Sequence, residues 1–212
     1  FSTLCFDNRG CGKTTTDTEF TIQEIVCDIV DLWEHLKITR SHLLGISLGG
    51  VIAQLVAQSH PEKIDNLLLI STTAQKIYLT SLEGKPWPQD KEEIFQRLNT
   101  YFSFDFQQKN KYLIEVMAKN MYNNPNKEGI KKQAHAIKQF VWEKLQPSKI
   151  RAKTLILHGN NDVIIPLEAA KDLQNKIEIA SLKVFDNCGH LLMAEKPLDL
   201  FSEIKNFLLS QK

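Results

Sequence analysis

Three residues far apart in the chain have the types and the order of a nucleophile, an orienting acid and a general base. Ser47 lies inside Gly45-Ile-Ser-Leu-Gly49, and Asp162 and His190 follow in that order. A serine hydroxyl becomes a strong nucleophile when an imidazole accepts its proton, and a carboxylate then holds the imidazole in the required tautomer. These residue types predict acyl transfer, with Ser47 attacking a carbonyl carbon.

The residues around Ser47 predict a strand followed directly by a helix. The apolar run 42–46 has the composition of a strand, and residues 48–59 have that of a helix. A GxSxG sequence between a strand and a helix is typical of a nucleophile elbow, in which a sharp turn exposes the serine. We expect Gly45 and Gly49 to leave room for a close backbone approach.

The turn at Ser47 also predicts a donor for the oxyanion of an acyl-transfer intermediate. In a nucleophile elbow the backbone N–H of the following residue points toward the reacting carbonyl oxygen. That residue is Leu48.

Asp162 and His190 each follow a short predicted strand. Residues 154–157 precede the first of them, and residues 182–185 precede the second. Because the carboxyl ends of parallel strands meet at one edge of a sheet, both side chains are expected there with Ser47. The strand predicted at 64–70 ends in Ser71-Thr72-Thr73 and offers no carboxylate, so Asp162 is the expected acid.

The other histidines have weaker cases as the base. Those on predicted helices are expected to be exposed or capping groups, and two more lie at the ends of strands. Of these two, His158 lies close to Asp162 in the sequence and is the stronger alternative to His190 as the base. The helical histidines are His35, His60 and His135, and the strand-end histidines are His42 and His158.

The remaining pattern predicts an α/β fold. Strands alternate with helices, which is typical of a mostly parallel sheet with helices on both faces. Residues 1–6 predict a first strand, and Thr21-Ile-Gln-Glu24 is a capping box that predicts the start of a helix. Apolar residues at helical spacing predict one buried face for that helix. They are Ile22, Ile25, Val26, Ile29, Trp33 and Leu36.

Residues 74–148 interrupt this alternation. The segment is rich in aromatic and charged residues and predicts several helices, among them 91–98 and 112–120. The alternation resumes with helices expected at 166–175 and 197–209. We therefore predict a core of residues 1–73 and 149–212 and an inserted helical domain of residues 74–148.

These motifs resemble those of the α/β-hydrolase superfamily. Asp7-Asn-Arg-Gly-Cys-Gly-Lys-Thr14 resembles its D-x-R-G-x-G-x-S turn, and Cys188-Gly-His190 with Glu195-Lys-Pro197 resembles its G-H-x-x-x-x-E-x-P ending. The Ser, Asp, His order is that of the family, and Gly45-Ile-Ser-Leu-Gly-Gly50 is similar to elbows of its enol-lactonase and methylesterase-like branches. The resemblance implies that residues 74–148 form a cap and that Asp7 and Arg9 are structural.

The resemblance also implies an incomplete N-terminus. Family members carry earlier strands and an HG-type loop that donates a second oxyanion N–H, and neither precedes Phe1 here. The first strands are therefore expected to be missing from this chain. Loss of one oxyanion donor typically lowers the rate about 10²–10³-fold.

Composition excludes several other classes of protein. The net charge of +1 provides no positive field for nucleic acid, and the apolar runs are too short to span a membrane. Four scattered cysteines without metal-ligand spacing predict free thiols in a reduced, cytoplasmic protein. Gly12-Lys13-Thr14 lacks the earlier glycine of a phosphate-binding loop, because Asp7 stands there. No cofactor or metal is expected.

The sequence thus predicts a serine hydrolase acting on a small or medium carboxylic ester or lactone. Hydrolysis of a carbon–carbon bond, a thioester or a peptide uses the same three residues and stays open. A non-catalytic receptor or a degraded remnant of such an enzyme also stays open, because a fold does not fix a function. The aromatic residues of 74–148 suit either a substrate pocket or the core of that segment itself.

Overall fold

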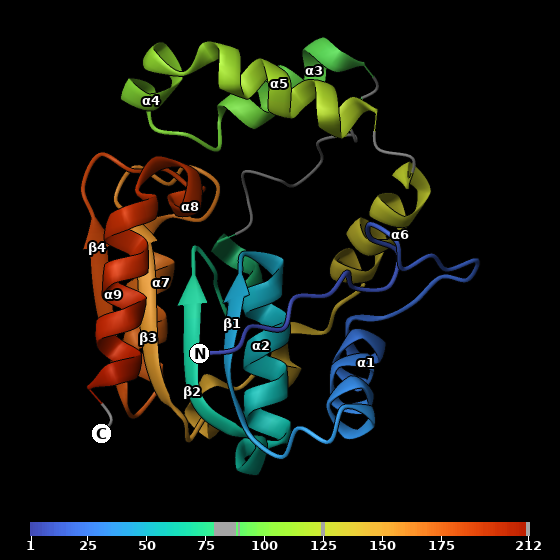
Figure 1. The fold of residues 1–212 in the computed structure, drawn as a ribbon, viewed down its shortest axis with the longest axis vertical. Helices are drawn as coiled ribbons and strands as arrows, with labels where there is room; N and C mark the ends of the chain where they lie inside the picture. The colour runs from blue at the N-terminus through green and yellow to red at the C-terminus, as the bar shows by residue number, and fades with distance from the viewer. Residues whose placement is uncertain (79–87, 89, 124–125, 211–212) are drawn as a thin grey trace. The chain divides into compact units, whose positions relative to one another are not determined.

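The chain divides into two compact units. The computed structural model describes residues 1–78, 88, 90–123 and 126–210 (Figure 1). One unit comprises Phe1–Thr39 and Asn123–Val141, and the other comprises Arg40–Tyr122 and Trp142–Lys212. The predicted helical cap, residues 74–148, has residues in both units, and its bounds remain a prediction.

The larger unit is built on a parallel sheet. Its strands are β1 (Ser41–Ile46), β2 (Ile64–Ile70), β3 (Lys153–Gly159) and β4 (Ala180–Phe185), hydrogen-bonded in the order β1-β2-β3-β4 (Figure 1). All three pairings are parallel. The strands predicted around Ser47, Asp162 and His190 are thereby confirmed, and their carboxyl ends lie at the same edge.

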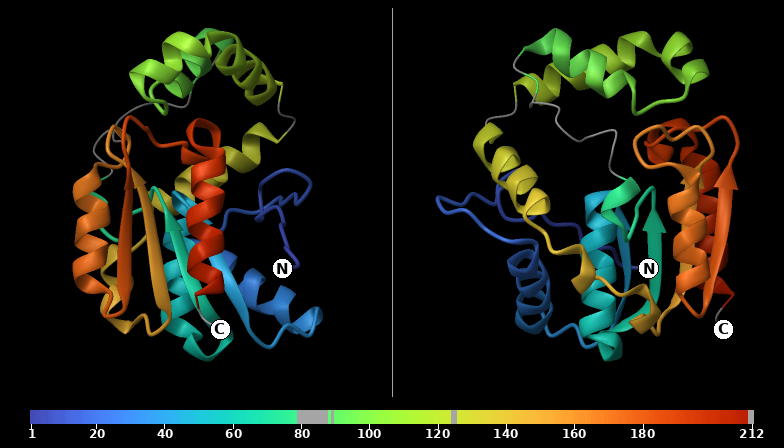
Figure 2. Two further views of the ribbon diagram at one scale, coloured as in Figure 1. Left: turned by 60° about the vertical axis from the view of Figure 1, so that its left-hand side comes forward. Right: turned by 180° about the vertical axis from the view of Figure 1, so that it is seen from behind.

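Helices cover both faces of this sheet. α2 (Leu48–Ser59) and α7 (Leu167–Lys176) pack on one face, and α9 (Pro197–Leu209) packs on the other (Figure 2). The run Leu67–Ile70 of β2 is buried along its whole length, as expected for a strand covered on both sides. The predicted parallel α/β architecture is therefore confirmed.

Between β2 and β3 the chain forms a small helical layer with its own core. It contains α3 (Lys91–Asn99), α4 (Phe104–Lys109) and α5 (Lys111–Tyr122), followed by the 3-10 turns η3 (Trp142–Lys144) and η4 (Pro147–Lys149). Another 3-10 turn, η1 (Pro61–Lys63), precedes β2. The helical core consists of Ile94, Leu98, Phe102, Ile114 and Ala118.

Two of the aromatic residues in this layer serve its own packing. The rings of Phe102 and Phe106 stack with their centroids 4.9 Å apart. A short helix, α8 (Leu192–Glu195), follows His190, and its N-cap Leu191 and its own Ala194 pack against the same core. Neither α4 nor α8 was predicted, because six- and four-residue helices leave little periodicity to detect.

The smaller unit contains α1 (Ile22–His35) and α6 (Lys127–Lys138). The predicted capping box is formed: Thr21 Oγ1 accepts from the Glu24 N–H at 3.2 Å, and the Thr21 N–H donates to Glu24 Oε2 at 2.8 Å. The predicted apolar face is buried except for Leu36, which caps the helix and is 45% exposed. Arg9 forms an ion pair with Asp28, in keeping with a structural role.

The strand expected at residues 1–6 is not formed. This segment has no regular secondary structure, and Phe1, Leu4 and Phe6 are 80%, 45% and 41% exposed. A strand needs the hydrogen bonds of a neighbouring strand, and its composition alone does not supply them. Outside the four named strands, the described residues contain only an isolated bridge between Cys11 and Thr14.

None of the helices described here combines the length and the hydrophobicity needed to cross a lipid bilayer.

Candidate active site

Ser47 occupies a strained turn between β1 and α2. Its backbone has φ 52° and ψ −118°, a conformation that costs a non-glycine residue on the order of 1–3 kcal/mol. Two hydrogen bonds hold it there: the Ser47 N–H donates to the Ile70 carbonyl at 2.9 Å, and Thr72 Oγ1 donates to the Ser47 carbonyl at 2.7 Å. The end of β2 therefore provides the contacts that hold the half-buried serine in this turn, as in a nucleophile elbow.

Two glycines around Ser47 make the turn possible. They are Gly45 and Gly50, whereas the expected pair was Gly45 and Gly49. A side chain on Gly45 would overlap the carbonyl oxygen of Gly49, and one on Gly50 would come within 2.5 Å of the Thr72 side chain. The expectation for Gly49 itself is wrong, because a Cβ there meets no atom within 4 Å. Close packing is needed at Gly45 and Gly50, where α2 passes β1 and the end of β2.

The structure brings the three predicted residues together in one hydrogen-bonded chain. His190 Nε2 lies 3.0 Å from Ser47 Oγ, and His190 Nδ1 lies 2.7 Å from Asp162 Oδ2. A carboxylate only accepts hydrogen bonds, so Nδ1 carries the proton and Nε2 is left to accept from the serine hydroxyl. His190 is 4% exposed and Asp162 is 6% exposed.

Asp162 is fixed by the backbone of its own loop. Its Oδ1 accepts from the N–H groups of Ile164 and Ile165, each at 2.9 Å. Because these two bonds occupy one carboxylate oxygen, the other is directed at His190. The acid thus has a single orientation before any substrate arrives.

His158 is close to Asp162, but its Nε2 is bonded to a backbone carbonyl and not to Ser47. Its Nε2 donates to the carbonyl of Ile165 at 2.9 Å and lies 3.5 Å from Asp162 Oδ2. The ring is fully buried, and burial lowers the pKa of His158 below its ordinary value. Its position supports the choice of His190 over His158 as the base.

The remaining histidines either have other hydrogen-bond partners or are exposed. His42 Nδ1 is hydrogen-bonded to Asn66 Nδ2 at 3.1 Å, and His60 is hydrogen-bonded to Ser59 at 2.9 Å. His35 and His135 are exposed on their helices, as expected.

The lowered pKa of His158 predicts a loss of stability in acid. Below a pH of about 6.5 the unfolded chain binds a proton at this residue that the folded chain resists, so the free energy of unfolding falls as the pH decreases. Urea denaturation at pH 5 and pH 8 measures this difference. We expect His158→Gln to reduce the pH dependence, and the same change at His135, which is exposed, is the control. An identical pH dependence in His158→Gln and the unmodified chain would contradict the assignment.

The Leu48 N–H lies where an oxyanion donor is expected. Leu48 is the first residue of α2, and its N–H donates to no acceptor in the part of the chain that the structure describes. The N-terminus of a helix also carries a partial positive charge that stabilises nearby negative charge. This group is therefore available to a carbonyl oxygen bound beside Ser47.

Apolar side chains lie next to the triad. Ile164 and Ile165, on the loop that carries Asp162, form a cluster with Tyr78 and Tyr101. The Tyr101 ring centroid is 5.5 Å from that of His190, and burial raises the pKa of the Tyr101 phenol, which stays neutral. The sequence analysis missed Tyr101 because its place is set by packing. Thr72 was detectable, since it follows a strand that ends at the same edge.

Cys188, two residues before His190 in the sequence, is buried and unreactive. Cys188 is fully buried, and burial raises the pKa of its thiol to about 12. The thiolate, which is the reactive form, is therefore absent at neutral pH. All four cysteines are free thiols.

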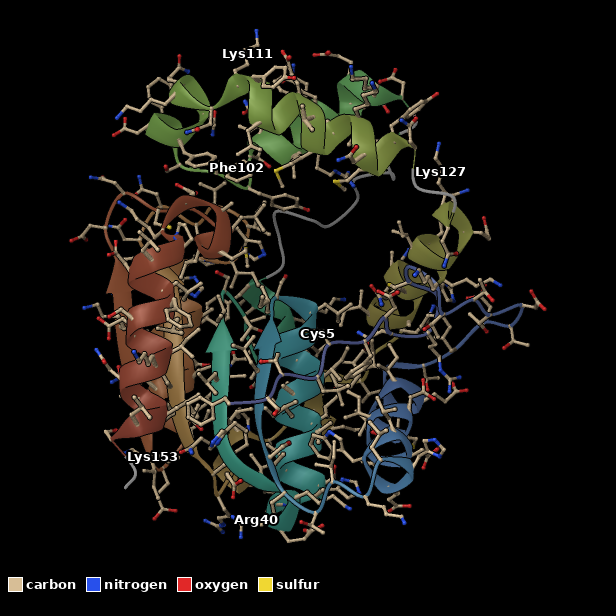
Figure 3. All side chains as sticks on the ribbon, viewed as in Figure 1. Cys5, Arg40, Phe102, Lys111, Lys127 and Lys153 are labelled. Carbon is tan, nitrogen blue, oxygen red and sulfur yellow. The ribbon has the colours of Figure 1, made fainter. Side chains whose placement is uncertain are left out.

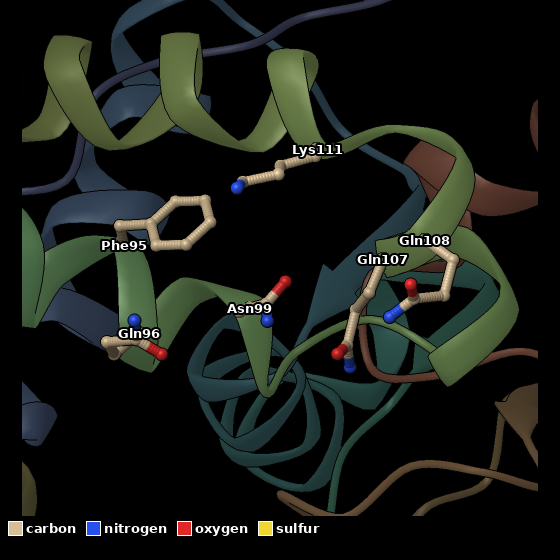
Figure 4. Close-up of a pocket in the computed structure, with 6 residues that line it drawn as sticks. All are labelled: Phe95, Gln96, Asn99, Gln107, Gln108 and Lys111. Carbon is tan, nitrogen blue, oxygen red and sulfur yellow. The ribbon is translucent and has the colours of Figure 1, made fainter.

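A polar pocket of about 300 Å³ lies among the helices α3, α4 and α5 and is separate from the triad. Figure 4 shows its lining, in which Phe95 and Lys111 face each other across Asn99. Lys111 lies on the opposite side of these helices from Phe102, which faces α8 (Figure 3). The lining of this pocket contains none of the three residues Ser47, Asp162 and His190.

Known proteins resemble this chain over most of its length. The family model for the alpha/beta hydrolase fold matches residues 1–197. The chain is 26% identical to a 2-hydroxy-6-oxo-2,4-heptadienoate hydrolase of Pseudomonas putida F1, over 91% of this chain and 72% of that protein. It is also 26% identical to a proline iminopeptidase of Lactobacillus crispatus, over 97% and 79%.

A solved structure shows the same fold. The meta-cleavage product hydrolase of Pseudomonas fluorescens IP01 superposes with a TM-score of 0.81 at 20% identity, covering 97% of this chain and 79% of that one. The family match extends over most of the sequence and includes the segments that carry Ser47, Asp162 and His190. The chain therefore belongs to the alpha/beta hydrolase fold family.

Proposed function

We propose that this hydrolase cleaves a small or medium carboxylic ester or lactone through an acyl-enzyme formed on Ser47. The observation that carries the proposal is the continuous hydrogen-bonded chain from Ser47 through His190 to Asp162. Each member has, at hydrogen-bonding distance, the atom that its role requires. We infer that Ser47 is the nucleophile, His190 the base and Asp162 the acid that orients it.

The proposed reaction has two steps. Ser47 Oγ attacks the carbonyl carbon while His190 Nε2 takes the hydroxyl proton, and the Leu48 N–H stabilises the negative charge on the carbonyl oxygen. The alkoxy group leaves with the proton that His190 returns. Water then attacks the acyl-enzyme with the help of the same base, releasing the acid and restoring Ser47.

The surroundings of the triad support a substrate with an apolar portion. Ile164, Ile165 and Tyr101 form an apolar cluster beside Asp162 and His190, and apolar surroundings with few polar groups are usual for small-molecule sites. We propose residues 74–148 as the cap that covers the substrate. An uncharged acyl group of moderate size suits this surface better than a densely charged one.

Carbon–carbon bond hydrolysis is the second candidate, and the similarity to the heptadienoate hydrolase favours it. The compound named there is an oxo acid without an ester or amide, so its hydrolysis breaks a carbon–carbon bond beside a carbonyl. The same triad chemistry applies, since a carbonyl carbon is again the centre that is attacked. The similarity to the iminopeptidase adds prolyl peptides to the substrates worth testing.

The test is covalent labelling of Ser47 by a serine-directed fluorophosphonate, followed by intact-mass measurement. We expect one adduct on the unmodified chain and none on Ser47→Ala, because only an activated serine reacts. A folded chain that forms no adduct would contradict the proposed triad. A panel of esters, lactones, dienoate oxo acids and prolyl peptides then identifies the bond that is cleaved, and labelling without any turnover would favour a receptor.

A further inference from the structure

The loop that carries His190 is joined to a segment far away in the sequence. The carbonyl of Tyr101 accepts from the N–H of His190 at 2.8 Å and from that of Leu191 at 3.3 Å. The two segments are so close that a Cβ on Gly189 would lie 2.7 Å from the Tyr101 carbonyl oxygen. The residues that connect α3 to α4 therefore pack directly against the loop that carries His190.

A single carboxylate connects these two segments. Glu195 Oε1 accepts from the N–H groups of Gly189 and Ser103, each at 2.9 Å. Glu195 Oε2 accepts from the Ser103 hydroxyl at 2.5 Å, and Ser103 is only 2% exposed. Charge-assisted bonds of this kind are about twice as strong as neutral ones.

The backbone at Glu195 is anchored to the sheet. Glu195 ends the helix α8, whose Leu192 is fully buried in the core cluster that includes Leu157 and Phe185. Pro197 then begins α9, which packs on the sheet. Because α8 is packed on the core of the sheet, we infer that the Glu195 carboxylate keeps both segments in a fixed position relative to β3 and β4.

Resting on the proposed function, we propose that Glu195 is a positioning residue for the base. Its carboxylate holds the Gly189 N–H and the segment of Ser103, whose neighbour Tyr101 accepts from the His190 N–H, so that His190 Nε2 stays within reach of Ser47 Oγ. Through the bonds from Glu195 to Ser103, the position of His190 also depends on the helices α3 and α4. Displacing a reacting group by about 1 Å typically costs on the order of 10²-fold in rate.

The experiment compares Glu195→Ala with Glu195→Gln. Alanine leaves the N–H groups of Gly189 and Ser103 without their acceptor. Glutamine retains all three contacts, because its oxygen accepts from both N–H groups and its NH₂ donates to the Ser103 hydroxyl. We expect the fluorophosphonate labelling rate to fall about 10²-fold in Glu195→Ala and to stay close to that of the unmodified chain in Glu195→Gln. The matched control is Glu203→Ala on α9, whose carboxylate pairs with Lys183 at 2.8 Å.

Hydrogen exchange separates positioning from general stability. We expect faster exchange at Ser103, Gly189 and His190 in Glu195→Ala, with β2 and β3 unchanged. Equal labelling in all variants, or an exchange increase spread over the whole sheet, would overturn the proposal. If the unmodified chain is not labelled at all, the proposed function fails, whereas the exchange data still decide whether Glu195 holds the loop.

Gly189→Ala tests the same junction without altering the carboxylate. Its methyl group would press on the Tyr101 carbonyl, so we expect the same local rise in exchange and slower labelling. Labelling and exchange like those of the unmodified chain would contradict the proposal, even if Glu195→Ala did not fold.

Discussion

Replacement of His190 by alanine is expected to lower kcat/KM by about 10⁶-fold, the cost of losing the base in a serine protease with the same arrangement. Among the described residues, His190 is the one histidine hydrogen-bonded to Ser47 Oγ. His158 is the nearest alternative, but its Nε2 donates to the Ile165 carbonyl. The Ser47 hydroxyl would therefore lose the acceptor that lies 3.0 Å away.

The measurement is turnover of whichever panel substrate the unmodified chain hydrolyses, with circular dichroism to confirm folding. His135→Ala is the control, because that side chain is exposed on α6. Added imidazole is expected to restore part of the activity of His190→Ala by entering the space left by the ring. A folded His190→Ala variant that keeps more than about a hundredth of the activity would disprove the assignment, since general base catalysis supplies about 10²–10⁴-fold or more.

Asp162→Asn is expected to lower kcat/KM by about 10⁴-fold with little change in the fold. The reason is the way the acid is held. The N–H groups of Ile164 and Ile165 require an oxygen at the Oδ1 position, so the asparagine NH₂ must face His190 Nδ1. Two donors cannot face each other. His190 would therefore move its proton to Nε2, where it could no longer accept from Ser47.

The matched control is Asp186→Asn. Asp186 is an exposed carboxylate that accepts a hydrogen bond from Asn160 at 3.0 Å and does not contact the triad. Kinetics on the same substrate and proton NMR of the imidazole ring would report the rate and the tautomer. An Asp162→Asn variant that is as active as the Asp186→Asn control would show that another group orients the base.

Local patterns in the sequence predicted the parts of the fold that depend on neighbouring residues. The strand, serine and helix around Ser47 follow from the glycine spacing and the apolar run, and the capping box at Thr21 follows from two side chains three residues apart. The triad was predictable because its members follow strands of one parallel sheet, which must end at the same edge.

Features set by tertiary contact were not predictable in this way. The segment 1–6 has the composition of a strand, but no ladder forms among the described residues. Gly49 was expected to be crowded because it belongs to the motif, whereas the close contact is at Gly50 and Thr72. The bonds from Glu195 to Ser103 join residues whose nearness no local pattern reveals.

The long connection between β2 and β3 affects how this sheet folds and how it can diverge. Leu68 pairs with Leu155 only after the whole helical segment between them has been spanned, and pairing of strands so distant in sequence slows folding. The thermodynamic cost is small, however, because each doubling of a connection's length costs only about 0.6 kcal/mol in loop-closure entropy. Segments of different length and composition can therefore replace one another at this position while the strand register persists. Recombination at this point would give a protein engineer a route to new substrate preferences, provided that the junction at Glu195 is rebuilt with each new segment.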